Sequence, residues 1–327
     1  MLFYLSAYQE YMWPDIMNAN HFYHKLMKDL HMNLSQLQSF VALADMGSFT
    51  EAAYAINLTQ SAVSHALSTL ESELGVMLLE RNRKGVVALT DAGQKILPHV
   101  RTLLAQAEAI EQEAKAAQGE TSGKLRLGSM ASLVPPRLLA GLLTCFQKRY
   151  PEMKVVLFEG AMHEVGEWIE KSIIDVGFVV LPAPGITSTS ITIDELCVIV
   201  PPKHRLRTRE AVKPAELREE GFIMEKTQCA LRLLERAGLE SDRTRSLIRY
   251  QASDSTTILA MVREGLGITL MPRKMLPKKL EGVAALSLDP PQPLQIGLAI
   301  RSQAAASRGA KLFVETALNW AKEQTSD

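Results

Sequence analysis

Five polar side chains recur on one face of a predicted helix and carry the chemistry that this sequence offers. They are Gln60, Ser61, Ser64, His65 and Ser68. Gln can pair with the edge of an adenine, whereas Ser and a helix N-terminus suit phosphate oxygens. This set at the start of a helix indicates insertion into the major groove of DNA. The alternative is a solvated polar face on an ordinary helical hairpin, and the surrounding sequence has to decide between the two.

No residue pattern points to catalysis or to a bound metal. The chain lacks H-E-x-x-H, G-x-S-x-G and G-x-x-x-x-G-K-[ST], and Gly265-Leu266-Gly267 lacks the third glycine of a dinucleotide loop. His21 and His24 have no Cys or carboxylate cluster beside them. We therefore expect no catalytic residue, no metal, no cofactor and no enzymatic activity.

The three cysteines, Cys145, Cys197 and Cys229, are too few and too far apart for a disulfide framework, and they form no C-x-x-C pair. A redox switch needs an accessible, activated thiolate and preferably a resolving partner. Cys229 is the candidate for such a switch. A plain buried thiol is the alternative that the sequence favours.

Two short helices joined by a turn position the polar face. Ser48 and Glu51 suit a capping box that begins the first helix, and Thr59 can cap the second. The apolar positions of the second helix recur at helical spacing: Val63, Leu67, Leu70 and Leu74. An earlier helical stripe, which ends at Gly47, supplies a third helix behind them: Leu34, Leu37, Phe40, Val41 and Ala44.

A predicted hairpin follows these helices, with strands at 76–81 and 86–89 around a turn that contains Asn82 and Gly85. It would act as a wing that places Arg81, Arg83 and Lys84 beside phosphates. Between residues 32 and 89, however, three basic residues stand against five acidic ones, a formal net charge of −2. Because non-specific DNA affinity depends mostly on phosphate neutralisation, we expect a monomer to bind weakly.

Residues 90–117 predict a long helix that could join two copies of the chain and so compensate for the weak DNA binding of a monomer. Its apolar residues alternate spacings of four and three, which is typical of a coiled-coil seam. A long helix with so narrow an apolar stripe is unstable alone in water, so we expect pairing with a second copy. The predicted dimerisation residues are Ile96, Val100, Leu103, Ala107 and Ile110. Packing against the same chain is the alternative.

Three long runs now decide the interpretation: F-V-A-L-A-D-M-G-S-F-T-E-A-A, L-T-Q-S-A-V-S-H-A-L-S-T-L-E-S-E-L-G-V-M-L-L-E-R and V-A-L-T-D-A-G. Through these runs, residues 33–117 resemble the DNA-binding domain and linker helix of the LysR-type transcriptional regulators. Leu79 stands where the family usually has Phe, a conservative departure. The resemblance implies that the polar face lies on the DNA, with Arg81 and the wing on its backbone. Many relatives carry Arg at the position of His65.

The polar run Gln118–Lys124 holds two glycines and predicts a hinge. Strands and helices then alternate, which predicts parallel sheets with ligands outside the carboxyl ends of the strands. The runs G-K-L-R-L-G, F-x-x-R-Y-P, D-V-G-F-V-V and S-D-S-T-T-I-L-A-M-V-R-E-G-L-G-I-T-L-M-P resemble the LysR effector domain, which is similar to periplasmic solute-binding proteins. The effector candidates carried over by this resemblance are Ser129, Ser132, Gly160, Met162, Thr227, Gln228 and Ser253. Each could instead be a turn residue or a helix cap.

We therefore expect an α+β multidomain protein with an N-terminal winged helix-turn-helix, a long linker helix and a two-lobed α/β effector domain that resembles type 2 periplasmic binding proteins. At 327 residues with 47% hydrophobic content, the chain can hold two or three units. The predicted bounds are 1–31 for an N-terminal extension, 32–89 for the DNA-binding domain, 90–117 for the linker helix, 118–124 for the hinge and 125–327 for the effector domain. Within the last, lobe I covers about 125–192 and 302–327, and lobe II covers about 193–301.

The predicted function is sequence-specific DNA binding that a small-molecule effector modulates. The expected partners are double-stranded operator DNA, the effector, further copies of the chain in a homodimer or homotetramer, and RNA polymerase if the protein activates transcription. The sequence shows neither a run of about 20 apolar residues nor a secretory signal, so we expect a cytoplasmic protein without a membrane partner. The alternatives are a solute-binding module and a redox-sensing regulator that acts through Cys229.

Overall fold

The computed structural model describes residues 32–81, 87–130, 133–225, 229–239, 247–304 and 306–324. The chain forms two separately packed units, Met1–Leu104 and Ala105–Asp327. Within the described residues, no helix combines the length and the apolar character that crossing a membrane requires. The predicted N-terminal extension, residues 1–31, lies outside the described residues.

Three short helices open the first unit: α2 (Leu34–Met46), α3 (Phe49–Ala55) and α4 (Gln60–Leu74). Local capping sets their ends. The Ser48 hydroxyl accepts a hydrogen bond from the Glu51 N–H (3.4 Å), and the Thr59 hydroxyl accepts one from the Ala62 N–H (3.2 Å). Gly47 ends α2 in the left-handed conformation, which favours glycine. These are the starts and stops that the sequence predicts.

The apolar faces of the three helices meet in one core. Phe40, Leu43, Val63 and Leu70 are completely buried there. Ala52 and Ala53 of α3 are also buried, and their small side chains let α3 approach α2 and α4 closely. Burial of the Val63, Leu67 and Leu70 stripe turns the opposite face of α4 outward.

A two-stranded hairpin of β1 (Leu79–Arg81) and β2 (Val87–Leu89) follows, with antiparallel pairing from Leu79↔Leu89 to Arg81↔Val87. The Glu71 carboxylate, near the end of α4, accepts hydrogen bonds from the backbone N–H groups of Leu78 (2.7 Å) and Leu79 (3.1 Å). This buried side chain therefore fixes the hairpin to α4. Residues 82–86, which form the predicted wing tip, lie outside the described residues.

The helix α5 (Asp91–Ala117) begins against the same hairpin. The Thr90 hydroxyl donates to the Met77 carbonyl (2.7 Å) and accepts from the Gly93 N–H (3.0 Å). A Cβ at Gly93 would lie 2.1 Å from the Leu78 carbonyl oxygen, so only glycine permits this approach. Further along α5, Arg101 pairs with Asp45. The first half of α5 is thus part of the first unit's core.

The second unit contains a mixed seven-stranded sheet. Six of its strands run in the order β10-β6-β11-β5-β3-β4, and β7 pairs with β11. The strands are β3 (Gly123–Met130), β4 (Met153–Gly160), β5 (Val176–Val180), β6 (Thr187–Val200), β7 (Ala211–Val212), β10 (Thr269–Pro272) and β11 (Ala284–Ile300). The pairs β3–β4 and β3–β5 are parallel. The pairs β5–β11, β11–β6 and β6–β10 are antiparallel. The predicted parallel sheet is therefore confirmed for β3, β4 and β5, and the antiparallel pairing of β6, β10 and β11 departs from it.

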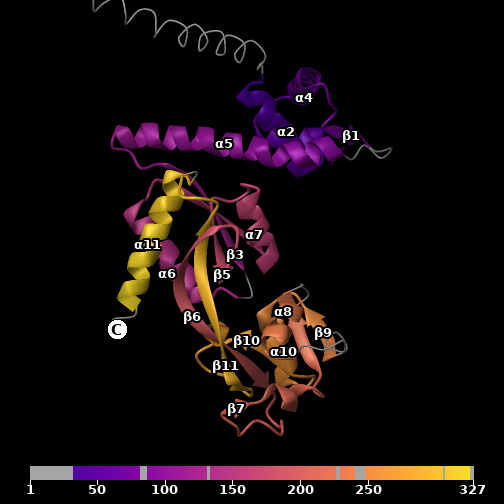
Figure 1. The fold of residues 1–327 in the computed structure, drawn as a ribbon, viewed down its shortest axis with the longest axis vertical. Coiled ribbons are helices and arrows are strands. Elements are labelled where there is room, and N and C mark those ends of the chain that lie inside the picture. The colour runs from indigo at the N-terminus through magenta and orange to yellow at the C-terminus, as the bar shows by residue number, and fades with distance from the viewer. Residues whose placement is uncertain are drawn as a thin grey trace, which may run out of the picture. The chain divides into compact units, whose positions relative to one another are not determined.

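Helices cover both faces of the β3, β4 and β5 part of this sheet (Figure 1). They are α6 (Pro136–Arg149) and α11 (Arg308–Gln324) on one face and α7 (Met162–Glu170) on the other. Phe146 of α6 packs edge-on against Phe313 of α11, with ring centroids 5.2 Å apart. Gly128 and Gly177 are paired on neighbouring strands under α7, and a Cβ at Gly177 would lie 2.7 Å from a Val165 methyl. These two glycines bring α7 close to the sheet.

The two longest strands, β6 and β11, extend between the two ends of this unit. At one end β11 pairs with β5 through Ile296–Ala299, and at the other β6 pairs with β10 through Leu196–Ile199. The β6–β11 ladder is interrupted between Ser287 and Gln292. The sequence predicts only 196–200 and 294–300 as strands, so both are much longer than expected.

The second lobe packs around the far ends of these strands. It adds the parallel pair β8 (Phe222–Glu225) and β9 (Ile248–Ala252), the helices α8 (Cys229–Arg236) and α10 (Ser255–Arg263), and the 3₁₀ turns η1 (Pro214–Leu217) and η2 (Arg273–Met275). One apolar cluster contains Phe222, Leu234 and Leu270, and another contains Ile223, Ile258 and Val262. The first lobe has its own apolar cluster around Leu127, Phe146 and Phe178.

We predict that Glu71→Leu loosens the attachment of the hairpin to α4. Two buried N–H groups would lose a charged acceptor, which should cost roughly 2 kcal/mol locally. Amide hydrogen exchange at Leu78 and Leu79 should then be about 30-fold faster than in the unchanged protein. Ser72→Ala, at an exposed neighbour, is the matched control. Equal exchange rates in both variants would contradict the role assigned to Glu71.

Candidate functional site

The outward face of α4 carries the predicted DNA-contacting side chains. Gln60, Ser61, His65 and Ser68 are exposed, and Ser64 is half-buried. Ser64 and Ser68 line a surface hollow of about 500 Å³ together with Phe49 and Met77, so they lie on the hairpin side of α4. The structure therefore brings all five side chains to one solvent-facing side of one helix.

Several neighbours restrain this face without blocking it. The Ser61 hydroxyl lies 3.0 Å from the Thr59 hydroxyl, which also caps the helix. The Thr69 hydroxyl donates to the His65 carbonyl (2.9 Å) and also lies 3.5 Å from Nδ1 of the His65 imidazole. The side chain of Arg81 and the residues Arg83 and Lys84 lie outside the described residues.

The predicted dimerisation residues divide into two groups along α5. Val100 is buried at 6% exposure in the core of its own unit, and Ile96 packs against the same core. Leu103 is 44% exposed and Ile110 is 71% exposed, with Ala107 half-buried between them. Packing within the chain therefore accounts for the first two positions. The exposed part of the predicted seam begins at Leu103.

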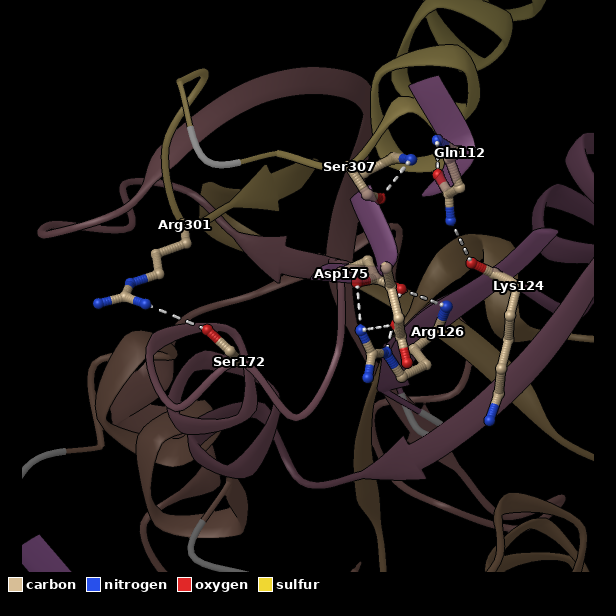
Figure 2. A network of polar contacts seen from close by, with 10 residues as sticks. Gln112, Lys124, Arg126, Ser172, Asp175, Arg301 and Ser307 are labelled. Atoms are coloured by element: carbon tan, nitrogen blue, oxygen red, sulfur yellow. Dashed lines mark hydrogen bonds and ion pairs between the residues drawn. The ribbon is translucent and has the colours of Figure 1, made fainter. Parts of the chain in front are cut away.

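The last turns of α5 are bound to the second unit by a buried side-chain amide. Gln112, only 7% exposed, donates from Nε2 to the Lys124 carbonyl (3.2 Å) and accepts from the Gly309 N–H (3.1 Å). Figure 2 shows Gln112 beside Lys124 and Ser307. These bonds join α5, which precedes the predicted hinge at residues 118–124, to β3 and α11. The hinge remains a prediction for residues 118–122, which lie between α5 and β3.

An ion-pair group lies next to this amide (Figure 2). Arg126 of β3 donates to both carboxylate oxygens of Asp175 (3.2 and 2.9 Å) and to Glu108 of α5 (2.9 Å). Burial alone would lower the pKa of Arg126, but the hydrogen bond to Asp175 and the charges of Asp175 and Glu108 raise it above its ordinary value. Arg126 thus stays charged and joins α5 to the sheet of the first lobe.

The structure describes four of the seven effector candidates. Ser129 is buried near the end of β3, and Gly160 ends the neighbouring strand β4, where its backbone lies under the Trp168 ring. Met162 begins α7 and is half-buried, whereas Ser253 is exposed after β9. Ser129, Gly160 and Met162 lie at one end of the β3–β4 pair, as predicted. Ser132, Thr227 and Gln228 lie outside the described residues.

A cavity of about 470 Å³ lies beside these strand ends, and Met162 is the only one of the four described candidates that lines it. Its other charged and polar lining residues are His163, Glu167 and Glu170 of α7 and Arg232 and Arg236 of α8. The sequence interpretation missed all five. A signal was present, because spacings of four and three place the α7 residues on one helical stripe and a spacing of four does so for the α8 pair.

The structure describes the surroundings of two of the three cysteines. Cys197 is completely buried in β6, and its Sγ lies 3.1 Å from the Met271 carbonyl. Burial raises the pKa of this thiol to about 12. Cys145 is half-buried in α6, and the side chain of Cys229 lies outside the described residues. The described part of the chain contains no group of three or more His, Cys, Asp or Glu residues that could hold a metal ion.

Two family models match the chain. Residues 34–94 match the bacterial regulatory helix-turn-helix protein, lysR family, and residues 118–322 match the LysR substrate binding domain. The two matches cover the unit that presents α4 and the unit that contains the cavity.

Relatives of known sequence extend over most of the chain. The HTH-type transcriptional regulator YvbU of Bacillus subtilis is 33% identical over 295 residues, which covers 88% of this chain and 98% of that protein. The DNA-binding transcriptional dual regulator OxyR of Escherichia coli is 30% identical over 281 residues, which covers 83% of this chain and 90% of that protein.

Solved structures share the fold. A full-length OxyR variant from Pseudomonas aeruginosa has a TM-score of 0.68 at 21% identity and covers 88% of this chain and 98% of that one. Full-length CbnR complexed with its target DNA has a TM-score of 0.57 at 23% identity and covers 89% of this chain and 100% of that one.

We predict that Gln112→Leu releases the last turns of α5. The substitution leaves the Gly309 N–H and the Lys124 carbonyl without their partner, at a cost of roughly 2 kcal/mol. Because proteolysis follows the population of the open form, trypsin should cleave after Lys115 about 10- to 30-fold faster. Glu111→Gln, at an exposed neighbour on α5, should cleave at the original rate. An unchanged rate for Gln112→Leu would show that the amide does not hold the helix.

Proposed function

Because this chain belongs to the LysR family of DNA-binding transcriptional regulators, we propose that it binds operator DNA through α4 and that a small molecule in its second unit controls this binding. The observation that carries the proposal is the exposed polar face of α4, which faces solvent because the other face is buried in the core. We place this activity in the cytoplasm, where the DNA is.

The DNA contacts would divide by chemistry. Gln60 and His65, both exposed, suit base edges, and the Ser61 hydroxyl at the first turn of α4 suits a phosphate. Ser64 and Ser68, on the hairpin side, suit the backbone that borders the groove. The side chains of Arg81, Arg83 and Lys84 would add cations to that backbone.

A homo-oligomer would overcome the low positive charge of the first unit. Leu103, Ala107 and Ile110 provide the apolar seam of α5 that packing within the chain leaves uncovered. Pairing of two copies would present two α4 helices to two half-sites. It would also double the number of phosphate contacts available to each complex. RNA polymerase would be a further partner if the protein activates transcription.

The coupling between the ligand and the DNA would pass through α5. Its last turns are joined to the first lobe by Gln112 and by Arg126 through Glu108, and its first turns pack in the DNA-binding core through Val100. A ligand changes DNA binding only if it favours one arrangement of the protein over another. Of the effector candidates, Met162 lines the cavity of about 470 Å³ and would contact the ligand there, whereas Ser129, Gly160 and Ser253 do not line it.

Redox sensing through Cys229 is the alternative, and it is supported by the similarity to Escherichia coli OxyR and to proteins called probable hydrogen peroxide-inducible genes activators. Cys197 does not suit the role of resolving thiol, because burial raises its pKa to about 12. Loss of a peroxide response in Cys229→Ser would favour this alternative over ligand control.

We predict that Gln60→Ala weakens specific DNA binding. The test uses a duplex that the unchanged protein selects from a random pool. Loss of one side chain that pairs with a base should cost about 1–3 kcal/mol, or roughly 10- to 100-fold in affinity, with little change on unrelated DNA. Ser72→Ala, at the far end of α4, should bind as before. If Gln60→Ala bound the selected duplex with the same affinity as the unchanged protein, the assignment of Gln60 to the DNA interface would be contradicted.

We predict that Ile110→Lys separates the copies while the fold persists. Ile110 is 71% exposed within its own chain, so the substitution leaves the chain's core intact. Loss of its burial against a second copy should weaken association roughly tenfold or more. Sedimentation velocity should show this shift, and Glu111→Gln provides a control with the same change in net charge one position away. Identical association in both variants would exclude the α5 seam.

A further inference from the structure

The cavity of about 470 Å³ in the second unit has walls of two kinds. Its volume is within the range of sites that hold small molecules. The apolar lining comes from both lobes and from the segment that follows β5: Leu133, Val179, Leu181, Pro182, Pro184, Ile186, Leu233 and Leu294. This surface would favour an apolar group, because burying apolar surface away from water lowers the free energy.

The charged lining comes from two helices with opposite signs. On α7, Glu167 and Glu170 supply carboxylates, and on α8, Arg232 and Arg236 supply guanidinium groups. Within the described part of the chain, no N···O distance of 4.0 Å or less joins these acids to these bases. Glu167 pairs with Lys171 of its own helix (2.8 Å), and Arg236 donates to the Pro293 carbonyl (3.0 Å). Glu170 and Arg232, which have no such partner among the described residues, therefore offer both signs of charge to a third group, with Glu167 and Arg236 beside them.

This balance decides what kind of ligand fits. The α8 guanidinium groups would attract a simple anion, but the α7 carboxylates would repel it. A simple cation would be attracted by the carboxylates and repelled by the guanidinium groups. A zwitterion, which carries one positive and one negative group, can pair each group with the side chains of opposite charge. Guanidinium and carboxylate form short, charge-assisted hydrogen bonds, which gives the acidic end of such a molecule a defined position.

We propose that the cavity binds a small α-amino acid with an apolar side chain. Its carboxylate would pair with Arg232 and Arg236, its ammonium group with Glu167 and Glu170, and its side chain would lie on the apolar lining. His163 lies on the α7 wall, and its Nδ1 is buried without a hydrogen-bond partner in the described residues. A polar ligand group can satisfy this nitrogen after a half-turn of the ring, which relieves an unpaired buried atom.

This inference rests on the proposed function for its biological role, because the ligand would be the effector. One molecule that pairs with both helices would draw α7 of the first lobe and α8 of the second towards each other. Such a ligand binds the closed arrangement more tightly than the open one, which is the requirement for control.

Isothermal titration of the full chain with matched probes tests the proposal. L-phenylalanine and L-leucine each have a counterpart without the amino group, 3-phenylpropionate and 4-methylvalerate, and one without the carboxylate, 2-phenylethylamine and 3-methylbutylamine. At least one amino acid should bind roughly tenfold more tightly than both of its counterparts. Equal or tighter binding of the acid or the amine would overturn the proposal, and so would the absence of binding by both amino acids.

Single substitutions then locate the site. Arg232→Gln and Glu170→Gln should each lower the affinity for the bound amino acid roughly tenfold, because each removes one charge from one wall. Lys311→Gln, an exposed change on α11 away from the cavity, should have no effect. Unchanged affinity in both cavity variants would place the amino acid elsewhere and contradict the proposal.

Band-shift titration with and without the bound amino acid separates this inference from the function it rests on. Salt-sensitive binding to the selected duplex without any amino acid affinity would leave the regulator intact and remove the ligand class. Amino acid binding by a protein that binds no DNA would support the ligand assigned to the cavity and contradict the proposed function.

Discussion

The buried amide of Gln112 is the constraint that gives the linker helix its place in the structure. A side-chain amide can donate and accept at once, and Gln112 does both, towards the Lys124 carbonyl and the Gly309 N–H. Since both partners are backbone groups, one in β3 and one in α11, the bonds fix α5 to the main chain of the second unit. A buried apolar residue at this position would leave both groups unpaired.

The same helix is held at its other end by a different kind of contact. There Leu97 and Val100 are buried with Phe40 and Leu43, and the Thr90 hydroxyl and Gly93 bring the first turn against Leu78. Apolar packing thus fixes the beginning of α5, and hydrogen bonds with ion pairs fix its end. The exposed side chains of Leu103 and Ile110 lie between Val100 and Gln112 along the helix.

Local patterns in the sequence predict the parts of the fold that depend on near neighbours. The helix α4 and its polar face follow from a Thr59 cap and from the spacing of Val63, Leu67 and Leu70. The contacts of Gln112 could not be predicted, because Gly309 is 197 positions away and glutamine in a helix is usually solvated. The full length of β6 was missed because Thr and Ser fill its first half, and that of β11 because prolines interrupt it. The opposed charges of α7 and α8 follow helical spacing, but only the fold shows that they face one cavity.

The interrupted ladder between β6 and β11 has a mechanical consequence. Between Ser287 and Gln292 the chain leaves its β6 partner, and the segment contains Pro290 and Pro291, which have no N–H to donate. On β6 the partners of these two residues, Cys197 and Leu196, are adjacent, so the extra residues belong to β11 alone and β6 continues past them without a break. A strand that carries extra residues bends and twists more than its partner, so the path of β11 changes direction here while β6 keeps the two ends of the ladder joined.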